Sequence, residues 1–521
     1  MLVIAALAAY FFLLVVDLAG VARLIAGRDE MVQGSAAMAW HAARAAGGEP
    51  IYRDCLTHRP HVAAVYGPLI YLFPALIGRT IGASQPLAML LIGRGLSLLA
   101  TTITGVLIFA MARRLGARRL FAWIATLAAL SNPIFWNISA EYRADPITLC
   151  LLLAAVACFA GRDTRPARFL AALPLMAAFL CKPTSVAPLI AMAWFLWRRG
   201  RRREASGWLI VGGLLALGCI ASLNWLTDGG YRINAFEALR GSRAWSNLLV
   251  FPVTVLPLTL PQFAFAAWLI GVRLLRPQHG KPQHEAASNG VDVLIAWLGA
   301  AWLLAFLTTV RDGSAEYYFC ESLAGASILM ALQWQRWLDA STGRPADSTT
   351  ANPAHRPLHL AAFLAPVVVA IIALPKLEPG PVQRLGDLWN LSRVVRTDAD
   401  RFARRLALVN GLPKPVLCGD DSLSLFANQS PLMMDTWLFS GLIDRGVFDD
   451  SAIVGDLESG RFGAVVLNWP VEQAKRYQST WRIPPAWRDA IMRRYRPMFP
   501  DIGGLYVYAP RRAGEPGERL P

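Results

Sequence analysis

The chain has 521 residues, of which 55% are hydrophobic and only 17% are charged, and its formal net charge is +16. Because a water-soluble domain has about 25% charged residues, the composition excludes an ordinary soluble protein. The arginines cluster in short connectors between apolar segments, which excludes a nucleic-acid-binding surface and is typical of cytoplasmic loops in a membrane protein.

The apolar segments predict a polytopic membrane protein, since a helix needs about 20 such residues to cross a bilayer. A first span at 3–25 is expected to place a first outer loop, 27–65, outside the cytoplasm. A short segment at 66–83, broken by Pro68 and Pro74, is expected to lie at the interface or to re-enter. With every arginine-rich connector inside, the further spans are predicted at 86–111, 120–138, 146–160, 207–226, 248–275, 291–310, 322–338 and 358–375.

The apolar segment at 169–197 is too long for one span and too short for two. Lys182 and Pro183 are expected to break it into a hairpin of two half-length helices. A lysine at membrane depth is costly and usually faces a partner or an aqueous cavity. Lys182 is therefore a candidate functional residue.

From residue 376 onward, short β-rich runs alternate with amphipathic helical stretches, which predicts a small α/β domain. The expected organisation is a transmembrane helical domain at 1–375 and an extracytoplasmic α/β domain at 376–521. The fold class is mainly α, with about 10 to 12 membrane helices.

The stretch "EYRAD" (141–145) places three charged residues at the outer membrane surface. Asp145 precedes a proline, so one interpretation is a helix N-cap, and the other is a catalytic or metal-supporting carboxylate. Arg143 is suited either to snorkelling toward the interface or to binding a phosphate through its planar donor fork.

Two other outer segments carry polar candidates. Asp29 and Glu30 directly follow the first span, where they would either begin a helix favourably or supply a general base. The loop "VRDGSAEYYFCES" (310–322) adds Arg311, Tyr317 and Glu321 on the same side. No P-loop and no Gly-rich dinucleotide motif is present.

Five stretches, in order, resemble the membrane glycosyltransferases of the GT-C fold that use polyprenyl-phosphate sugars. They resemble above all the bacterial branch with the protein O-mannosyltransferases and the aminoarabinose transferase of lipid A (family 39-type). The stretches are "RDEMVQGSAAMAW" (28–40), "GGEPIYRD…YGPLIYLF" (47–73), "RADP" (143–146), "FLCKPTSV" (179–186) and "DGSAEYYFCES" (312–322). The chain departs from the family pattern at Gly67, where the family has proline, and at Tyr317, where it has asparagine.

The resemblance implies an inverting transfer from a polyprenyl-phosphate-linked sugar to an acceptor hydroxyl at the outer face of the cytoplasmic membrane. Asp29 or Glu30 would be the base, and Asp145 would orient Arg143 or help to hold a metal. The lipid phosphate and substrate would be bound by Arg143 and Lys182 first, with Arg59, Tyr66, Arg311, Tyr317 and Glu321 as further candidates. The cofactor stays open: a divalent cation, Mg²⁺ or Mn²⁺, would have Asp29 and Asp145 as its ligands.

Two other classes of function remain alternatives. A transporter or flippase of lipid-linked glycans would also carry intramembrane charges, although no internal repeat of the transporter kind is evident. A non-catalytic envelope-assembly scaffold would use the C-terminal domain to bind a partner. The sugar and the acceptor, which is a lipid, a glycan or a protein, are not encoded in any motif of the sequence.

Overall fold

The computed structural model describes residues 7–15, 34–161, 165–240, 245–250, 285–311, 316–341, 389–427, 429–473, 483–499 and 504–511, with residue 386 and some residues between 255 and 271. They divide into two compact units. The first comprises Met1–Arg23, Gly95–Gly218 and Arg243–Leu391, and the second Leu24–Arg94, Cys219–Ser242 and Ser392–Pro521. The predicted domain border at 375 lies outside the described residues.

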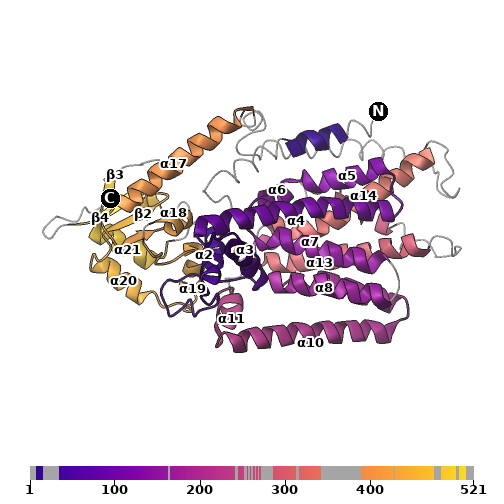
Figure 1. Cartoon of the computed structure of the whole chain (residues 1–521), viewed down its shortest axis with the longest axis horizontal. Helices are drawn as coiled ribbons and strands as arrows, with labels where there is room; N and C mark the ends of the chain where they lie inside the picture. Colours follow the sequence, from indigo (N-terminus) through magenta and orange to yellow (C-terminus); the bar gives the residue numbers. More distant parts are fainter. Residues whose placement is uncertain are drawn as a thin grey trace. The chain divides into compact units, whose positions relative to one another are not determined.

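The first unit consists of helices packed side by side (Figure 1). They are α5 (Arg119–Leu130), α6 (Pro133–Ser139), α7 (Ala144–Gly161), α8 (Arg165–Cys181), α9 (Ala187–Arg198), α13 (Glu285–Thr309), η3 (Glu316–Phe319) and α14 (Cys320–Ser341), together with most of α4 (Pro86–Arg114) and α10 (Arg202–Leu226). Helix α7 packs along α8, α13 packs against α9 and α14, and α14 also packs against α5. Trp297 of α13 and Leu329 of α14 are among the fully buried residues of this core.

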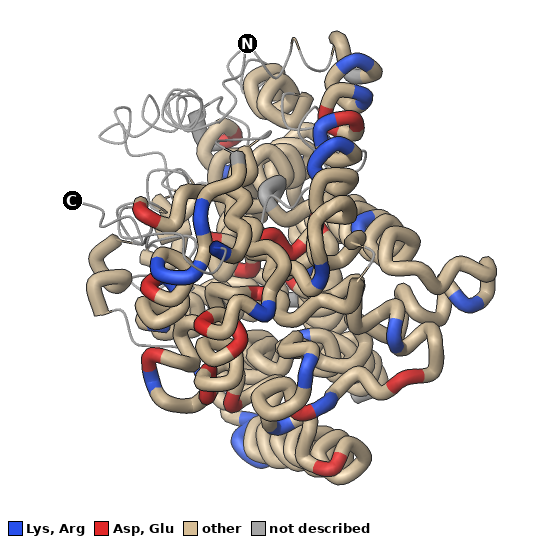
Figure 2. The backbone as a smooth tube through the Cα atoms, turned by 90° about the vertical axis from the view of Figure 1, so that its left-hand side faces the viewer, with Lys and Arg blue, Asp and Glu red and all other residues tan. Residues whose placement is uncertain are grey.

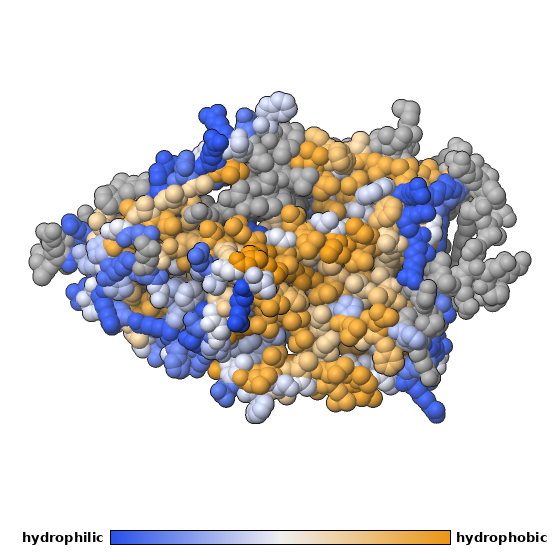
Figure 3. Space-filling view, in the orientation of Figure 1, coloured by the Kyte–Doolittle hydropathy of each residue, from blue (hydrophilic) through white to orange (hydrophobic). Residues whose placement is uncertain are grey.

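Three helices in the described part of the chain are long and apolar enough to cross a membrane: Pro86–Arg114, Arg202–Leu226 and Asn289–Thr309. They match the predicted spans at 86–111, 207–226 and 291–310. Apolar residues dominate the surface of the helical part in the view of Figure 3. The prediction of a mainly helical membrane protein is confirmed, whereas the spans predicted at 3–25, 248–275 and 358–375 lie wholly or partly outside the described residues.

Two breaks interrupt the predicted apolar segments. Lys182 and Pro183 do separate two helices, since α8 ends at Cys181 and α9 begins at Ala187. The predicted span at 120–138, in contrast, is not one helix. The side chain of Asn132 accepts a hydrogen bond from the Ile134 N–H, and Pro133 begins α6. An N-cap followed by proline starts a new helix. Hydrophobicity alone does not show this boundary, because the segment is apolar on both sides of it.

The second unit contains a small mixed sheet with helices, which confirms the predicted α/β fold. Its strands are β1 (Val416–Cys418), β2 (Ala464–Leu467), β3 (Tyr495–Phe499) and β4 (Tyr506–Pro510). The order is β1-β2-β4-β3, with β1 parallel to β2 and the other pairs antiparallel. The helical elements of this C-terminal segment are α17 (Leu391–Gly411), α18 (Asp421–Phe426), α19 (Thr436–Ile443), α20 (Ser451–Glu458), η6 (Val471–Gln473) and α21 (Pro485–Arg494). Acidic and basic residues are intermixed on the side shown in Figure 2.

The first outer loop packs with this sheet domain in the same unit. The loop and the segment that follows it carry α2 (Ser35–Ala46) and α3 (Leu69–Thr80), and α11 (Gly230–Arg232) and η1 (Ile233–Glu237) belong to the unit as well. The His61 N–H donates to the Leu432 carbonyl, and the Met434 N–H donates to the His61 carbonyl. The Asn234 side chain accepts from the Ala64 N–H at 2.8 Å. Backbone pairing over such distances in sequence makes the loop a structural part of the unit.

Candidate active site

The candidate site begins at the connection between α6 and α7. Helix α6 ends at Ser139 and α7 starts at Ala144, so Arg143 directly precedes the helix and Asp145 lies in its first turn. A carboxylate there is stabilised by the helix dipole. Because α7 begins before Asp145, this residue is not the N-cap that the Asp-Pro pair suggests, and its side chain turns to other side chains.

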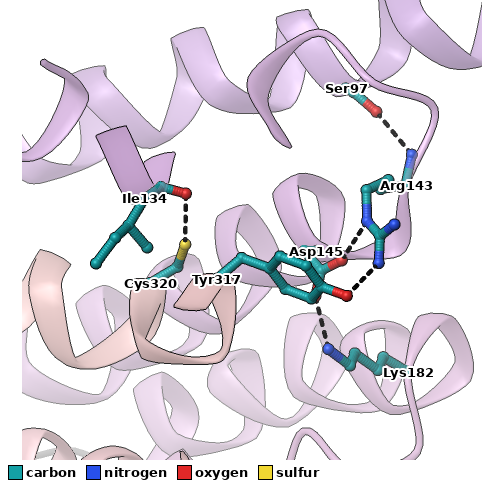
Figure 4. Close-up of polar contacts among 7 residues, drawn as sticks. All are labelled: Ser97, Ile134, Arg143, Asp145, Lys182, Tyr317 and Cys320. Atoms are coloured by element: carbon teal, nitrogen blue, oxygen red, sulfur yellow. Dashed lines mark hydrogen bonds and ion pairs between the residues drawn. The ribbon is translucent and has the colours of Figure 1, made fainter. Parts of the chain in front are cut away.

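Asp145 binds both predicted phosphate ligands (Figure 4). Its Oδ2 accepts a hydrogen bond from Arg143 Nε at 3.2 Å, and its Oδ1 accepts one from Lys182 Nζ at 2.6 Å. The side chains of Arg143 and Asp145 are 5% and 6% exposed, and that of Lys182 is 19% exposed. Three candidates from two separate sequence stretches thus meet in one cluster. Two cations share one carboxylate, which leaves one positive charge in excess among these three residues.

Two consecutive tyrosines of η3 cover the cations of this cluster. Arg143 Nη2 donates to Tyr317 Oη at 2.7 Å, and the guanidinium carbon lies 4.5 Å from the ring centroid. Lys182 Nζ lies 4.7 Å from the ring centroid of Tyr318. Such contacts are attractive and keep water from one side of each cation. Tyr317 was predicted as a site residue from the loop motif. Tyr318 follows Tyr317 in the same loop, but the loop motif predicts no role for it.

Glu321 lies near the cluster, at the start of α14. Its carboxylate is half-buried and accepts a hydrogen bond from Trp297 Nε1 of α13 at 3.2 Å. The neighbouring Cys320 Sγ lies 3.6 Å from the Ile134 carbonyl of α6 and fixes this end of α14 (Figure 4). Arg311 follows α13, where its backbone N–H donates to the Thr308 carbonyl.

Arg59 and Tyr66 belong to the second unit and have partners there. Arg59 Nη2 donates to Asp456 Oδ2 of α20 at 2.8 Å. The Tyr66 carbonyl accepts from the Tyr52 hydroxyl at 2.8 Å, and the Tyr66 N–H donates to Tyr71 Oη at 3.2 Å. These contacts hold the outer loop together, and a role of Arg59 or Tyr66 in substrate binding stays a prediction.

Asp29 and Glu30, the predicted bases, lie outside the described residues. Within the described part, no group of three or more His, Cys, Asp and Glu side chains is arranged to hold a metal ion. Both oxygens of Asp145 accept hydrogen bonds from cations, so a metal at this carboxylate would be a third cation on one anion. A divalent cation at Asp29 stays a prediction.

Comparison with known proteins reveals similarity in structure alone. No protein-family model matches the chain, and no curated protein shows a significant match in sequence. The structure resembles the crystal structures of ArnT from Cupriavidus metallidurans, bound to undecaprenyl phosphate (TM-score 0.53) and in the apo state (TM-score 0.54). In both cases the identity is 14%, over 95% of this chain and 97% of ArnT. A crystal structure of the Archaeoglobus fulgidus oligosaccharyltransferase in the apo form is also similar, with 12% identity over 97% of this chain and 75% of that one, and a TM-score of 0.49. The chain therefore has the GT-C fold of ArnT, as its sequence motifs predict.

Proposed function

We propose that the protein is a membrane glycosyltransferase that transfers a sugar from a polyprenyl-phosphate donor to an acceptor hydroxyl at the outer face of the cytoplasmic membrane. The observation that carries the proposal is the buried cluster in which Arg143 and Lys182 share Asp145. The likeness in fold to ArnT, whose crystal structure holds undecaprenyl phosphate, supports the same kind of donor.

The charge of the cluster fits the donor. A buried ion is stable only when it is paired or otherwise compensated, and Asp145 supplies one negative charge for two cations. A sugar linked to a polyprenyl chain through a phosphodiester carries one negative charge. Binding of this group beside Arg143 and Lys182 would therefore neutralise the three-residue cluster.

The same cations suit the leaving group. When the bond between the anomeric carbon and the phosphate oxygen breaks, that oxygen keeps the bonding electrons and the phosphate gains negative charge. Cations that are already oriented stabilise such a developing charge without reorganisation. Asp145 and Tyr317 orient Arg143, and Asp145 and Tyr318 orient Lys182. We assign Asp145 to this positioning role.

The other half of the reaction needs a base near the acceptor hydroxyl. Asp29, or its neighbour Glu30, is our candidate, because both acids directly follow the first predicted span on the outer side. The base would accept the hydroxyl proton as the oxygen attacks the anomeric carbon. A single displacement of this kind inverts the anomeric centre.

The proposal is tested by a transfer assay with the full chain in isolated membranes of its own cell, whose lipids, glycans and proteins supply the acceptor hydroxyl. Polyprenyl-phosphate-linked sugars are supplied, and release of free polyprenyl phosphate is measured. We expect release by the wild type, a loss of at least about 100-fold in the Arg143→Gln and Lys182→Met variants, and a comparable loss in Asp29→Asn. The matched control is Arg168→Gln, because Arg168 is ion-paired with Glu204 elsewhere in the first unit.

Two outcomes would contradict the proposal. If Arg168→Gln lost as much activity as Arg143→Gln, the effect would be one of folding and the cluster would have no special role. If no donor released its lipid phosphate while lipid-linked sugar still moved between leaflets, the protein would be a transporter.

A further inference from the structure

Helix α17 is longer than the domain that it packs against. Its C-terminal half contributes Phe402, Leu406 and Val409 to the apolar core beside the sheet. The same stripe continues toward the N-terminus through Ala399 and Val395, at the three- and four-residue spacing of a helix face, but these two residues are half-exposed. Figure 1 shows one end of α17 at the sheet and the other end reaching beyond it. The apolar face of the N-terminal half thus lies outside the core.

The residues at this N-terminal end combine an aromatic side chain with basic ones. Trp389, just before the helix, is 91% exposed. Arg393 and Arg396 are exposed, and the side chain of Arg401 is 52% exposed, with Asp398 at a loose 3.9 Å. Amphipathic helices with tryptophan near the apolar face and arginines on the polar face lie in the interface of a bilayer. Tryptophan itself prefers the depth of the lipid headgroups.

The chain reaches this helix directly from a segment with the composition of a membrane span. The sequence predicts a span at 358–375, outside the described residues, that ends on the outer side. Roughly 14 residues connect its end to Trp389, so the connection extends at most about 50 Å. With the span at its predicted place, the N-terminal end of α17 lies within about 50 Å of the outer membrane interface.

We infer that residues 389–401 form an interfacial anchor: Trp389 lies among the lipid headgroups, and Arg393 and Arg396 contact the phosphates of anionic lipids. The apolar stripe, which is only partly buried at Val395 and Ala399, faces the acyl chains. The anchor holds the extracytoplasmic domain at the bilayer surface through a helix that also belongs to the core of that domain. This inference concerns attachment to lipid and does not depend on the proposed reaction.

The first experiment measures lipid contact by photocrosslinking of the full chain in liposomes of phosphatidylcholine and phosphatidylglycerol. The photoreactive residue p-benzoylphenylalanine replaces Trp389, and lipid adducts are quantified by mass spectrometry. Trp225, which is 79% exposed on the apolar helix α10, is the positive control position, and Met498, which is 41% exposed on β3, is the negative one. We expect adducts at 389 to be comparable to those at 225 and several-fold above those at 498.

Adducts at 389 no more abundant than at 498 would overturn the inference. Crosslinks from 389 that run to a second copy of the chain in place of lipid would overturn it as well, because the uncovered face would then be a dimer interface. Intact packing of the substituted chain is checked by its unfolding temperature, so that a low yield is not mistaken for misfolding.

The second experiment tests the arginines with a matched pair of double variants. Arg393→Gln with Arg396→Gln removes two positive charges from the anchor. Arg493→Gln with Arg494→Gln removes two from α21, where both side chains are about equally exposed, at 61% and 59%. In liposomes with phosphatidylglycerol, we expect the first pair to lower the adduct yield at 389 by about threefold and the second to leave it unchanged. Equal yields in the two variants would overturn the contact between these arginines and anionic lipid.

Discussion

Replacing Asp145 with asparagine removes the negative charge that Arg143 and Lys182 share. The 3.2 Å contact to Arg143 Nε and the 2.6 Å contact to Lys182 Nζ both lose their ionic character, and one of the two cations then faces an amide NH2, which cannot accept its hydrogen bond. Removing one partner of a buried ion pair costs about 3–5 kcal/mol. Because the Lys182 side chain is 19% exposed, we expect the loss in free energy of unfolding to be near the lower limit, roughly 3 kcal/mol. For a chain of this size that corresponds to a decrease in unfolding temperature of about 3 °C.

The informative measurement is the effect of polyprenyl phosphate on that loss. A phosphate bound between Arg143 and Lys182 would supply the missing negative charge. The unfolding temperature of Asp145→Asn should therefore increase more on addition of polyprenyl phosphate than that of the wild type. The unfolding of each purified protein in detergent is followed by intrinsic fluorescence, with and without the lipid.

Asp456 provides a matched control. It too is shared by two arginines, Arg59 at 2.8 Å and Arg461 at 3.0 Å, but the arginine side chains are 42% and 68% exposed. Exposed ion pairs contribute about 0–1 kcal/mol, so Asp456→Asn should lose little stability and should gain no more from the lipid than the wild type does. If polyprenyl phosphate stabilised neither the wild type nor Asp145→Asn, the cluster would be a structural ion pair and the assignment of a phosphate site would be refuted.

Three further predictions follow from the site and the outer loop. Tyr318→Leu removes the ring over Lys182 and should lower kcat/KM for the donor about tenfold, while Tyr318→Phe keeps the ring and should stay within about twofold; steady-state kinetics decide between them. Because both oxygens of Asp145 already accept hydrogen bonds from cations, the Asp145→Asn variant should bind added Mn²⁺ as the wild type does, and a loss of binding in the variant would contradict this. Burial, with the charge of Arg44 nearby, lowers the pKa of His41 to about 3, below the value of about 6.5 expected in the unfolded chain. Below about pH 6.5 the unfolded chain therefore binds a proton that the folded protein does not, and the stability of the fold decreases as the pH falls toward 3. Acidification from pH 7 to pH 5 should cost about 2 kcal/mol of stability, and His41→Leu should show a smaller pH dependence in thermal unfolding.

The meeting of Arg143, Asp145 and Lys182 could be anticipated from the sequence, because membrane topology assigns both stretches to the same side. Topology limits where a charged residue can lie, and charged residues at membrane depth usually pair with one another. The detailed pairing could not be anticipated. Whether Asp145 caps α7 or binds side chains depends on a helix boundary that differs by one or two residues. The loop motif places Tyr318 on the same side as Tyr317, but no sequence pattern shows that its ring lies over Lys182.

The contacts of the outer loop show a different limit of sequence reasoning. Hydrophobic periodicity predicts an element and its buried face, but it gives no information on which distant segment lies opposite. The bond from Arg59 to Asp456, 397 positions apart, and the backbone pairing of His61 with residues 432 and 434 are of this kind. Arg59 is a candidate for the lipid phosphate only through the family resemblance, as a replacement for a basic residue of the family pattern, and that resemblance gives no information on its carboxylate partner.

One carboxylate serves two cations at both Asp145 and Asp456, so the number of charges alone does not identify a binding site. What differs is the access of water. At Asp456, water and salt ions screen the second positive charge of arginines that are half-exposed or more. At Asp145, the Arg143 side chain is 5% exposed and is covered by Tyr317, so solvent screens its charge only weakly. An anion attached to an apolar chain can bind at such a buried site, whereas a fully hydrated ion has a larger desolvation cost there. Burial of the cations around the shared carboxylate is therefore the property that makes this cluster suited to a lipid-linked phosphate.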